Sequence, residues 1–272
     1  MAKRSIKAFS EDDMTTHAAA LAYQTFFLLF PFALFLVALL GLLRLPELFD
    51  ALLVQARVVL PGQAAEAVEQ GIEQIRDQAG RGVLSFGIVV TLWSASAAVR
   101  MAMHALNVAY NVEEERPAWR RYSLSILYTV LVAVLAVSAS GFMLIGPQAA
   151  SWLAEQVGIG SLFVVLWAWL RVPVAVLLLV VLVALVYYLF PNTGQPFRFI
   201  TPGALLAVIG WLAASLGFSF YVSNFADYSA TYGSLGAVIV LLLYLFISAA
   251  VLLFGAEVNA ELRRQIGEGK EE

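Results

Sequence analysis

Six polar or aromatic side chains recur at helical spacing within one otherwise apolar part of the sequence. They are Trp93, Ser96, Arg100, His104, Asn107 and Asn111. Steps of three or four residues place them within an arc of about 60–80° on a helix. An arginine inside a membrane span costs at least ~2.5 kcal/mol unless it is paired, solvated or able to reach the membrane surface. The stripe therefore indicates a path for a solute, a proton or a lipid headgroup that opens to the cytoplasm.

A structural alternative accounts for the same side chains. Arg100 would extend along the helix to the membrane surface, while Asn107 and Asn111 would cap a helix end that projects beyond the membrane. Both interpretations stay open at the level of the sequence.

Arg100 requires an anionic partner if it lies in apolar surroundings. Glu257 ends the last apolar stretch, and Asp13 precedes the first one, followed on the same face by His17. Glu257 is the preferred partner because it lies at the cytoplasmic end of an otherwise apolar stretch. The alternative for Glu257 is a carboxylate exposed to water at the membrane surface.

A second stripe consists of small residues. Gly203, Ala207, Gly210, Ala214 and Gly217 follow one another at steps of four, three, four and three. Such a face lets a neighbouring helix approach closely. We expect it to serve helix packing.

Several kinds of chemistry are excluded. The chain has no cysteine and two histidines, and its formal net charge is −3, so it offers no basic surface for nucleic acid. The phosphate-binding loop, the dinucleotide fingerprint and the HExxH and GxSxG motifs are all missing. We therefore expect no catalytic residue, metal, cofactor or nucleic-acid partner.

Six long apolar stretches must position these residues. They cover approximately residues 18–43, 83–103, 124–145, 166–190, 204–222 and 235–256. Each can cross a hydrocarbon core of ~30 Å as a helix. Apolar residues make up 61% of the chain, against about 45–50% in a soluble domain. The sequence predicts an all-α, polytopic membrane protein with six transmembrane helices in a single domain, residues 1–272.

Positive residues orient the chain. They precede the first stretch, follow the second and sixth, and separate the fourth from the fifth: Lys3, Arg4, Lys7, Arg116, Arg120, Arg121, Arg198, Arg263, Arg264 and Lys270. The positive-inside rule places both termini in the cytoplasm and the loop 44–82 outside. That loop also contains four arginines, but it is rich in acidic residues as well.

The connecting segments carry local signals. Apolar residues at helical spacing predict short amphipathic helices in the first loop, 44–82, and in the third loop, near Pro147 and Trp152. Ser10 and Asp13 form a capping-box pattern that predicts the start of the first long helix. In the loop NVEEERPAWRR, Arg120 and Arg121 suit anionic lipid headgroups, and a loop whose charges pair internally is the alternative.

Four blocks of the sequence carry a family resemblance. They are HAAALAYQTFFLLFPF, LWSASAAVRMAMHALNVAYNVEEERP, ITPGALLAVIGWLAASLGFSFYV and NFADYSATYGSLGAVIVLLLYLFISAAVLLFGAEVNAEL. Together they resemble the YihY/BrkB family of bacterial inner-membrane proteins over nearly the whole chain. The resemblance implies six transmembrane helices and the cytoplasmic membrane. The family carries older labels as ribonuclease BN and as a virulence factor, and its members are regarded as candidate transporters with lipid-related roles.

The ribonuclease label does not fit the residues, because RNA cleavage needs a metal cluster or an acid–base pair beside a basic surface. We favour a transporter or lipid translocator in which Arg100, His104 and Asn107 line a polar cavity open to the cytoplasm, with Glu257 as counter-charge. An arginine there favours an anionic substrate, such as a phospholipid headgroup. The alternative is a membrane scaffold or accessory subunit that binds a second copy or another membrane protein.

Overall fold

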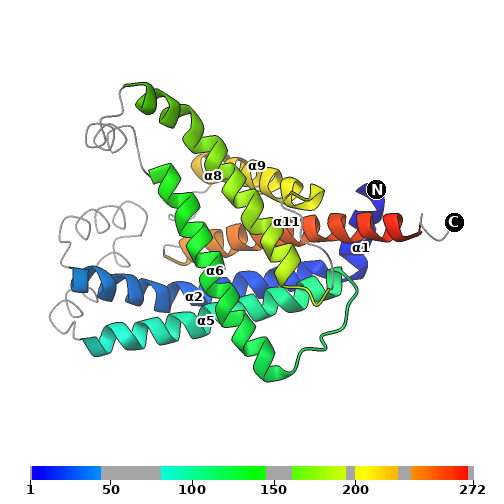
Figure 1. Cartoon of the computed structure of the whole chain (residues 1–272), viewed down its shortest axis with the longest axis horizontal. Coiled ribbons are helices and arrows are strands. Elements are labelled where there is room, and N and C mark those ends of the chain that lie inside the picture. The colour runs from blue at the N-terminus through cyan, green and yellow to red at the C-terminus, as the bar shows by residue number, and fades with distance from the viewer. Residues whose placement is uncertain (1, 44–80, 145–160, 194–199, 226–233, 269–272) are drawn as a thin grey trace. The chain divides into compact units, whose positions relative to one another are not determined.

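The computed structural model describes residues 2–43, 81–144, 161–193, 200–225 and 234–268. Within these ranges every regular element is an α-helix, which confirms the all-α prediction (Figure 1). The elements are α1 (Ala2–Glu11), α2 (Met14–Leu43), α5 (Arg81–Ala109), α6 (Ala118–Leu144), α8 (Ser161–Leu189), α9 (Pro202–Phe225) and α11 (Ser234–Glu268). The six long helices cover the six predicted apolar stretches to within one residue.

Four of the long helices have described segments that are long and apolar enough to cross a membrane. These segments are Phe86–Ala109, Val165–Leu189, Pro202–Val222 and Val238–Gln265. Large apolar side chains such as Phe86, Trp169 and Leu216 are exposed, as expected where lipid replaces water. The protein therefore belongs to the membrane class, while the count of six spans and the orientation of the termini stay predictions.

The amphipathic helices predicted in the first and third loops lie outside the described residues. The same is true of Asp227. Arg81 and Gly82, which the sequence assigned to the first loop, begin α5 instead.

The N-terminal prediction is wrong in one respect. Ser10 belongs to a separate helix, α1, and α2 begins only at Met14. Asp13 has a left-handed backbone conformation, with φ of 48°, so it cannot occupy the first turn of a helix. Helix α1 forms because Ser5 and Ala8, one turn apart, are both buried, and this tertiary contact outweighs the local capping signal.

The described chain divides into two compact units. The first comprises Met1–Met14, Met103–Leu212 and Val251–Glu272, and the second comprises Thr15–Ala102 and Ala213–Ala250. In the first unit, α6 packs against α8, and Met14, Met103, Leu106, Tyr187 and Leu253 form the fully buried part of the core. The single domain over residues 1–272 stays a prediction.

Polar bonds join helices within the second unit. The Thr91 hydroxyl of α5 donates to the backbone carbonyl of Pro31 in α2 at 2.8 Å. The hydroxyls of Ser215 in α9 and Tyr244 in α11 are 3.0 Å apart. Such bonds add to van der Waals packing where apolar burial alone gives little preference between helix and lipid.

Candidate functional site

Arg100 is held against its own helix. Its Nη1 donates to the Ser96 hydroxyl at 2.8 Å, and its guanidinium lies over the Trp93 ring, 5.7 Å from the ring centre. The Ser96 hydroxyl in turn donates to the Trp93 carbonyl at 2.8 Å. Ser96 is fully buried and Arg100 partly exposed. The first three residues of the predicted stripe, Trp93, Ser96 and Arg100, therefore contact one another in the second unit. They lie inside an apolar segment of α5.

The last two residues of the stripe, Asn107 and Asn111, lie where α5 ends. Asn111 has φ of 52°, and its N–H donates to the carbonyl of Val108 at 2.9 Å. The N–H of Val112 donates to the carbonyl of Asn107 at 2.9 Å, which completes a Schellman motif. Asn111 thus has the capping position named in the structural alternative, whereas His104, two turns earlier, is exposed.

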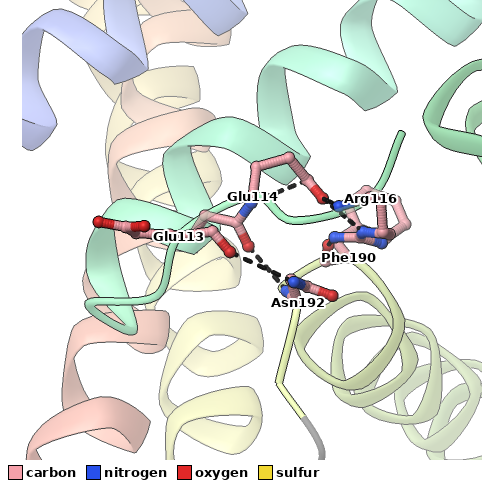
Figure 2. Close-up of polar contacts among 6 residues, drawn as sticks. Glu113, Glu114, Arg116, Phe190 and Asn192 are labelled. Carbon is pink, nitrogen blue, oxygen red and sulfur yellow. Dashed lines mark hydrogen bonds and ion pairs between the residues drawn. The ribbon is translucent and has the colours of Figure 1, made fainter. Parts of the chain in front are cut away.

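Asn107 belongs to a polar cluster that we call the loop clamp: Asn107, Glu114, Arg116 and Asn192. Asn107 donates to a Glu114 carboxylate oxygen at 3.0 Å and accepts from the backbone N–H of Asn192 at 2.7 Å. Arg116 binds Glu114 at 2.7 Å and also donates to the Phe190 carbonyl at 2.7 Å. Figure 2 shows Glu114 and Arg116 facing each other, with Asn192 beside Glu113, to whose carbonyl it donates at 3.2 Å. The clamp joins the end of α5, the loop 110–117 that leads to α6, and the segment that follows α8.

The clamp fixes the charge state of Glu114. Burial raises the pKa of this carboxyl, but hydrogen bonds from the side chain and backbone of Arg116, its charge and the Asn107 amide outweigh burial and lower the pKa. Internal pairing is therefore confirmed for Glu114 and Arg116. Arg120 and Trp119 remain exposed at the start of α6, and their contact with lipid headgroups stays a prediction.

Glu257 lies in a different polar cluster of the first unit. Its side chain is fully buried in α11, so the alternative of a water-exposed carboxylate is wrong. Neither carboxylate oxygen has a hydrogen-bond partner in the described part of the chain. The carboxyl of Asp12, between α1 and α2, faces it, and Glu261, Arg264 and Tyr110 lie near it. We call Asp12, Glu257 and Glu261 the carboxyl cluster.

Glu261 differs from Glu257 because it has partners. Arg4 of α1 lies 3.5 Å from one carboxylate oxygen, Arg264 lies 4.0 Å from the other, and Gln265 donates to the first at 2.9 Å. These two cations therefore neutralise Glu261.

The small-residue stripe on α9 meets α11 over part of its length. An added Cβ at Gly203 would collide with the Gly255 carbonyl and the Asn259 side chain, and one at Gly210 would lie 3.0 Å from Val251. Ala207 is buried in the same contact. Ala214 and Gly217 belong to the second unit, and no heavy atom of the described residues lies within 4 Å of a Cβ added at Gly217.

Asn259 secures this contact. Its side-chain oxygen accepts from the N–H of Gly203 at 2.8 Å, and its amide donates to the Thr201 hydroxyl at 2.9 Å. Thr201 also accepts from the N–H of Ala204 at 3.2 Å, as an N-cap residue does, and Pro202 follows at the first helical position. Asn259 of α11 therefore accepts one backbone N–H from the first turn of α9 and also binds its N-cap residue.

The remaining candidates are dispersed. Asp13 is exposed in the first unit, and His17 is half-buried in the second. The pairing of Arg100 with Glu257 or Asp13 stays a prediction. Within the described residues no group of three His, Cys, Asp or Glu side chains could hold a metal ion.

Three polar residues with notable positions were missing from the sequence-based candidates. Asp12 and Asn259 act through partners far away in the chain, which spacing cannot reveal. Arg171 lies inside the apolar segment Val165–Leu189. The signal for Arg171 was the same as for Arg100, a lone cation within an apolar run, and it could have been found.

Comparison with known proteins gives one consistent family. The profile described as "Virulence factor BrkB" matches residues 5–272. YfkH of Bacillus subtilis, which carries a ribonuclease-like name, is 37% identical over 248 residues, covering 91% of this chain and 90% of its own. A UPF0761 membrane protein of Xanthomonas campestris is 30% identical over 265 residues, covering 94% of this chain. The match spans 59% of that longer relative. No solved structure matches the chain.

Proposed function

Since the chain belongs to the YihY/BrkB family of membrane proteins, we propose that it is a transporter of the bacterial cytoplasmic membrane that moves a lipid with an anionic headgroup. The observation that carries this proposal is Arg100, a fixed cation in an apolar segment of α5. An ionisable residue at such a position is costly, and it is retained most often where it serves a substrate or ion path.

The contacts of Arg100 support a binding role. Ser96 occupies one guanidinium nitrogen and Trp93 covers one face of the group, which orients a planar donor that can hold a phosphate through two parallel bonds. Ser96 and the exposed His104 continue the polar path along α5. Asn107 and Asn111 have structural roles in the loop clamp and the helix cap. The proposed path therefore depends on Ser96, Arg100 and His104.

A membrane scaffold is the second candidate. It is favoured by the extent of internal polar bonding, because the loop clamp and the Asn259 cap use their side chains to join elements of the protein. A scaffold would need Arg100 only for stability.

Transport can be measured with the purified full-length chain in vesicles that contain headgroup-labelled fluorescent phosphatidylglycerol or phosphatidylcholine. We expect the protein to accelerate exchange of the anionic lipid between leaflets. Loss of a charge-assisted bond of about 1.5–3 kcal/mol predicts a decrease of about 10- to 100-fold in Arg100→Ala. Lys7→Ala, which removes an exposed cation, serves as the matched control.

Equal rates for wild type and empty vesicles, with an effect of Arg100→Ala only on thermal stability, would favour the scaffold. The same preparation should not cleave RNA above the level of a mock purification, since the non-enzymatic role is part of the proposal. A nuclease rate that follows the protein through purification and disappears with a carboxylate substitution would contradict it.

A further inference from the structure

We infer that Glu257 and Asp12 form a proton-binding site in which a single proton joins the two carboxyl groups. The inference deepens the proposed function, on which it rests for one point only: the proton bound here would be the ion coupled to lipid movement. The existence of the site itself depends only on the described geometry.

The bonding capacity of Glu257 limits what can lie beside it. A carboxylate has only acceptor atoms, and both of its oxygens are buried without a donor from the described part of the chain. The carboxyl of Asp12 faces Glu257 and is also an acceptor when ionised. Since Glu257 is fully buried, the repulsion between two such groups is relieved when one of them carries a proton that the other accepts.

The charged groups around the pair do not replace that proton. On α11, Glu261 and Arg264 lie 4.0 Å apart and act on Glu257 with opposite signs. From α1, Arg4 also binds Glu261. Beyond the end of α5, Tyr110 lies near Glu257, and Arg263 covers the Tyr110 ring at 5.8 Å from its centre. These cations therefore contact Glu261 and Tyr110, and the charge of Arg264 also acts on Glu257.

Asp12 gives the site access to water. It lies at the break between α1 and α2 and is partly exposed, whereas Glu257 is fully buried. A proton taken up at Asp12 can pass to Glu257 along the hydrogen bond that joins them. Asp13, at the same break, is also exposed and has a left-handed backbone conformation.

A proton fits the cluster better than a metal ion does. Calcium and magnesium require about six or more oxygen ligands, and one of the three carboxylates is already neutralised by Arg4 and Arg264. Addition of calcium or magnesium should therefore leave the thermal stability of the protein unchanged. Stabilisation by either ion that is lost in Glu257→Gln would overturn the inference in favour of a metal site.

The protonation of Glu257 can be observed directly by infrared spectroscopy of the purified full-length chain, because the C=O stretch of a protonated carboxyl is separate from that of a carboxylate. We expect a protonated-carboxyl band near neutral pH that shifts in deuterated water and is missing in Glu257→Gln. The amide keeps the shape of the protonated acid, so this variant should fold. Glu115→Gln, at an exposed loop position, should keep the band.

Coupling is tested in the lipid-exchange vesicles by imposing a pH gradient. The gradient should change the exchange rate of wild type several-fold and leave that of Glu257→Gln unaffected. Arg100→Ala should lose exchange but keep the infrared band, so failure of transport and failure of the proton site are distinguishable.

Identical infrared spectra for wild type and Glu257→Gln at every pH would overturn the site. A gradient response that persists in Glu257→Gln would overturn its coupling role. A double-mutant cycle of Arg100→Ala and Glu257→Gln that shows strong non-additivity in stability would also overturn the inference, because it would require an ionised Glu257 paired with Arg100.

Discussion

At the scale of single residues, the loop clamp illustrates how charges in a connecting segment act within the protein. Glu114 receives bonds from Arg116 and Asn107, and its side chain is only 18% exposed. The pairing of Glu114 with Arg116 was foreseeable because the two are close in the sequence. The bond from the Asn192 backbone to Asn107 crosses 85 positions, and no local pattern encodes a contact of that separation.

The clamp predicts a pH dependence of stability. Because the folded state lowers the pKa of Glu114, its contribution is present above the pKa of the unfolded chain and is lost as pH falls through the folded value. Glu114→Gln should cost about 1.5–3 kcal/mol near neutral pH and less in acid. Thermal unfolding in detergent across the acidic range measures this difference. A constant difference between wild type and variant at all pH values would contradict it, and the exposed Glu113→Gln is the control.

At the scale of elements, apolar length identified the long helices well, since each must satisfy its backbone bonds within itself in lipid. The short helix α1 escaped detection because its formation depends on the burial of Ser5 and Ala8. The small-residue stripe was visible in the sequence, but the point at which its contact with α11 ends, between Gly210 and Gly217, was not, because regular spacing carries no information about the partner.

The two ends of that stripe should respond differently to the same added methyl group. Gly203→Ala places a Cβ against the Gly255 carbonyl and Asn259, and overpacking of this kind costs about 1–3 kcal/mol. Gly217→Ala meets open space and should be neutral or slightly stabilising, since alanine favours a helix by up to about 1 kcal/mol over glycine. Thermal unfolding of both variants in one detergent is the measurement. Equal melting temperatures would refute the close approach at Gly203.

At the scale of the whole molecule, the distribution of Lys and Arg predicts the orientation of the chain. Single cysteines introduced at Gln74 and at Lys270 into this cysteine-free sequence should react with an impermeant thiol reagent from opposite sides of the membrane. Labelling of both from one side in intact cells would reverse the prediction. Wild type, which has no thiol, provides the blank.

The shared cap of α9 has a mechanical consequence. Because Asn259 holds the N–H of Gly203 and the hydroxyl of Thr201, any sliding of α11 along this end of α9 would leave a buried donor without an acceptor. Such a penalty makes the two helix ends behave as one rigid body. If the protein alternates between inward-open and outward-open states, the hinge must therefore lie elsewhere, and the paired ends of α9 and α11 form the frame against which the other parts move.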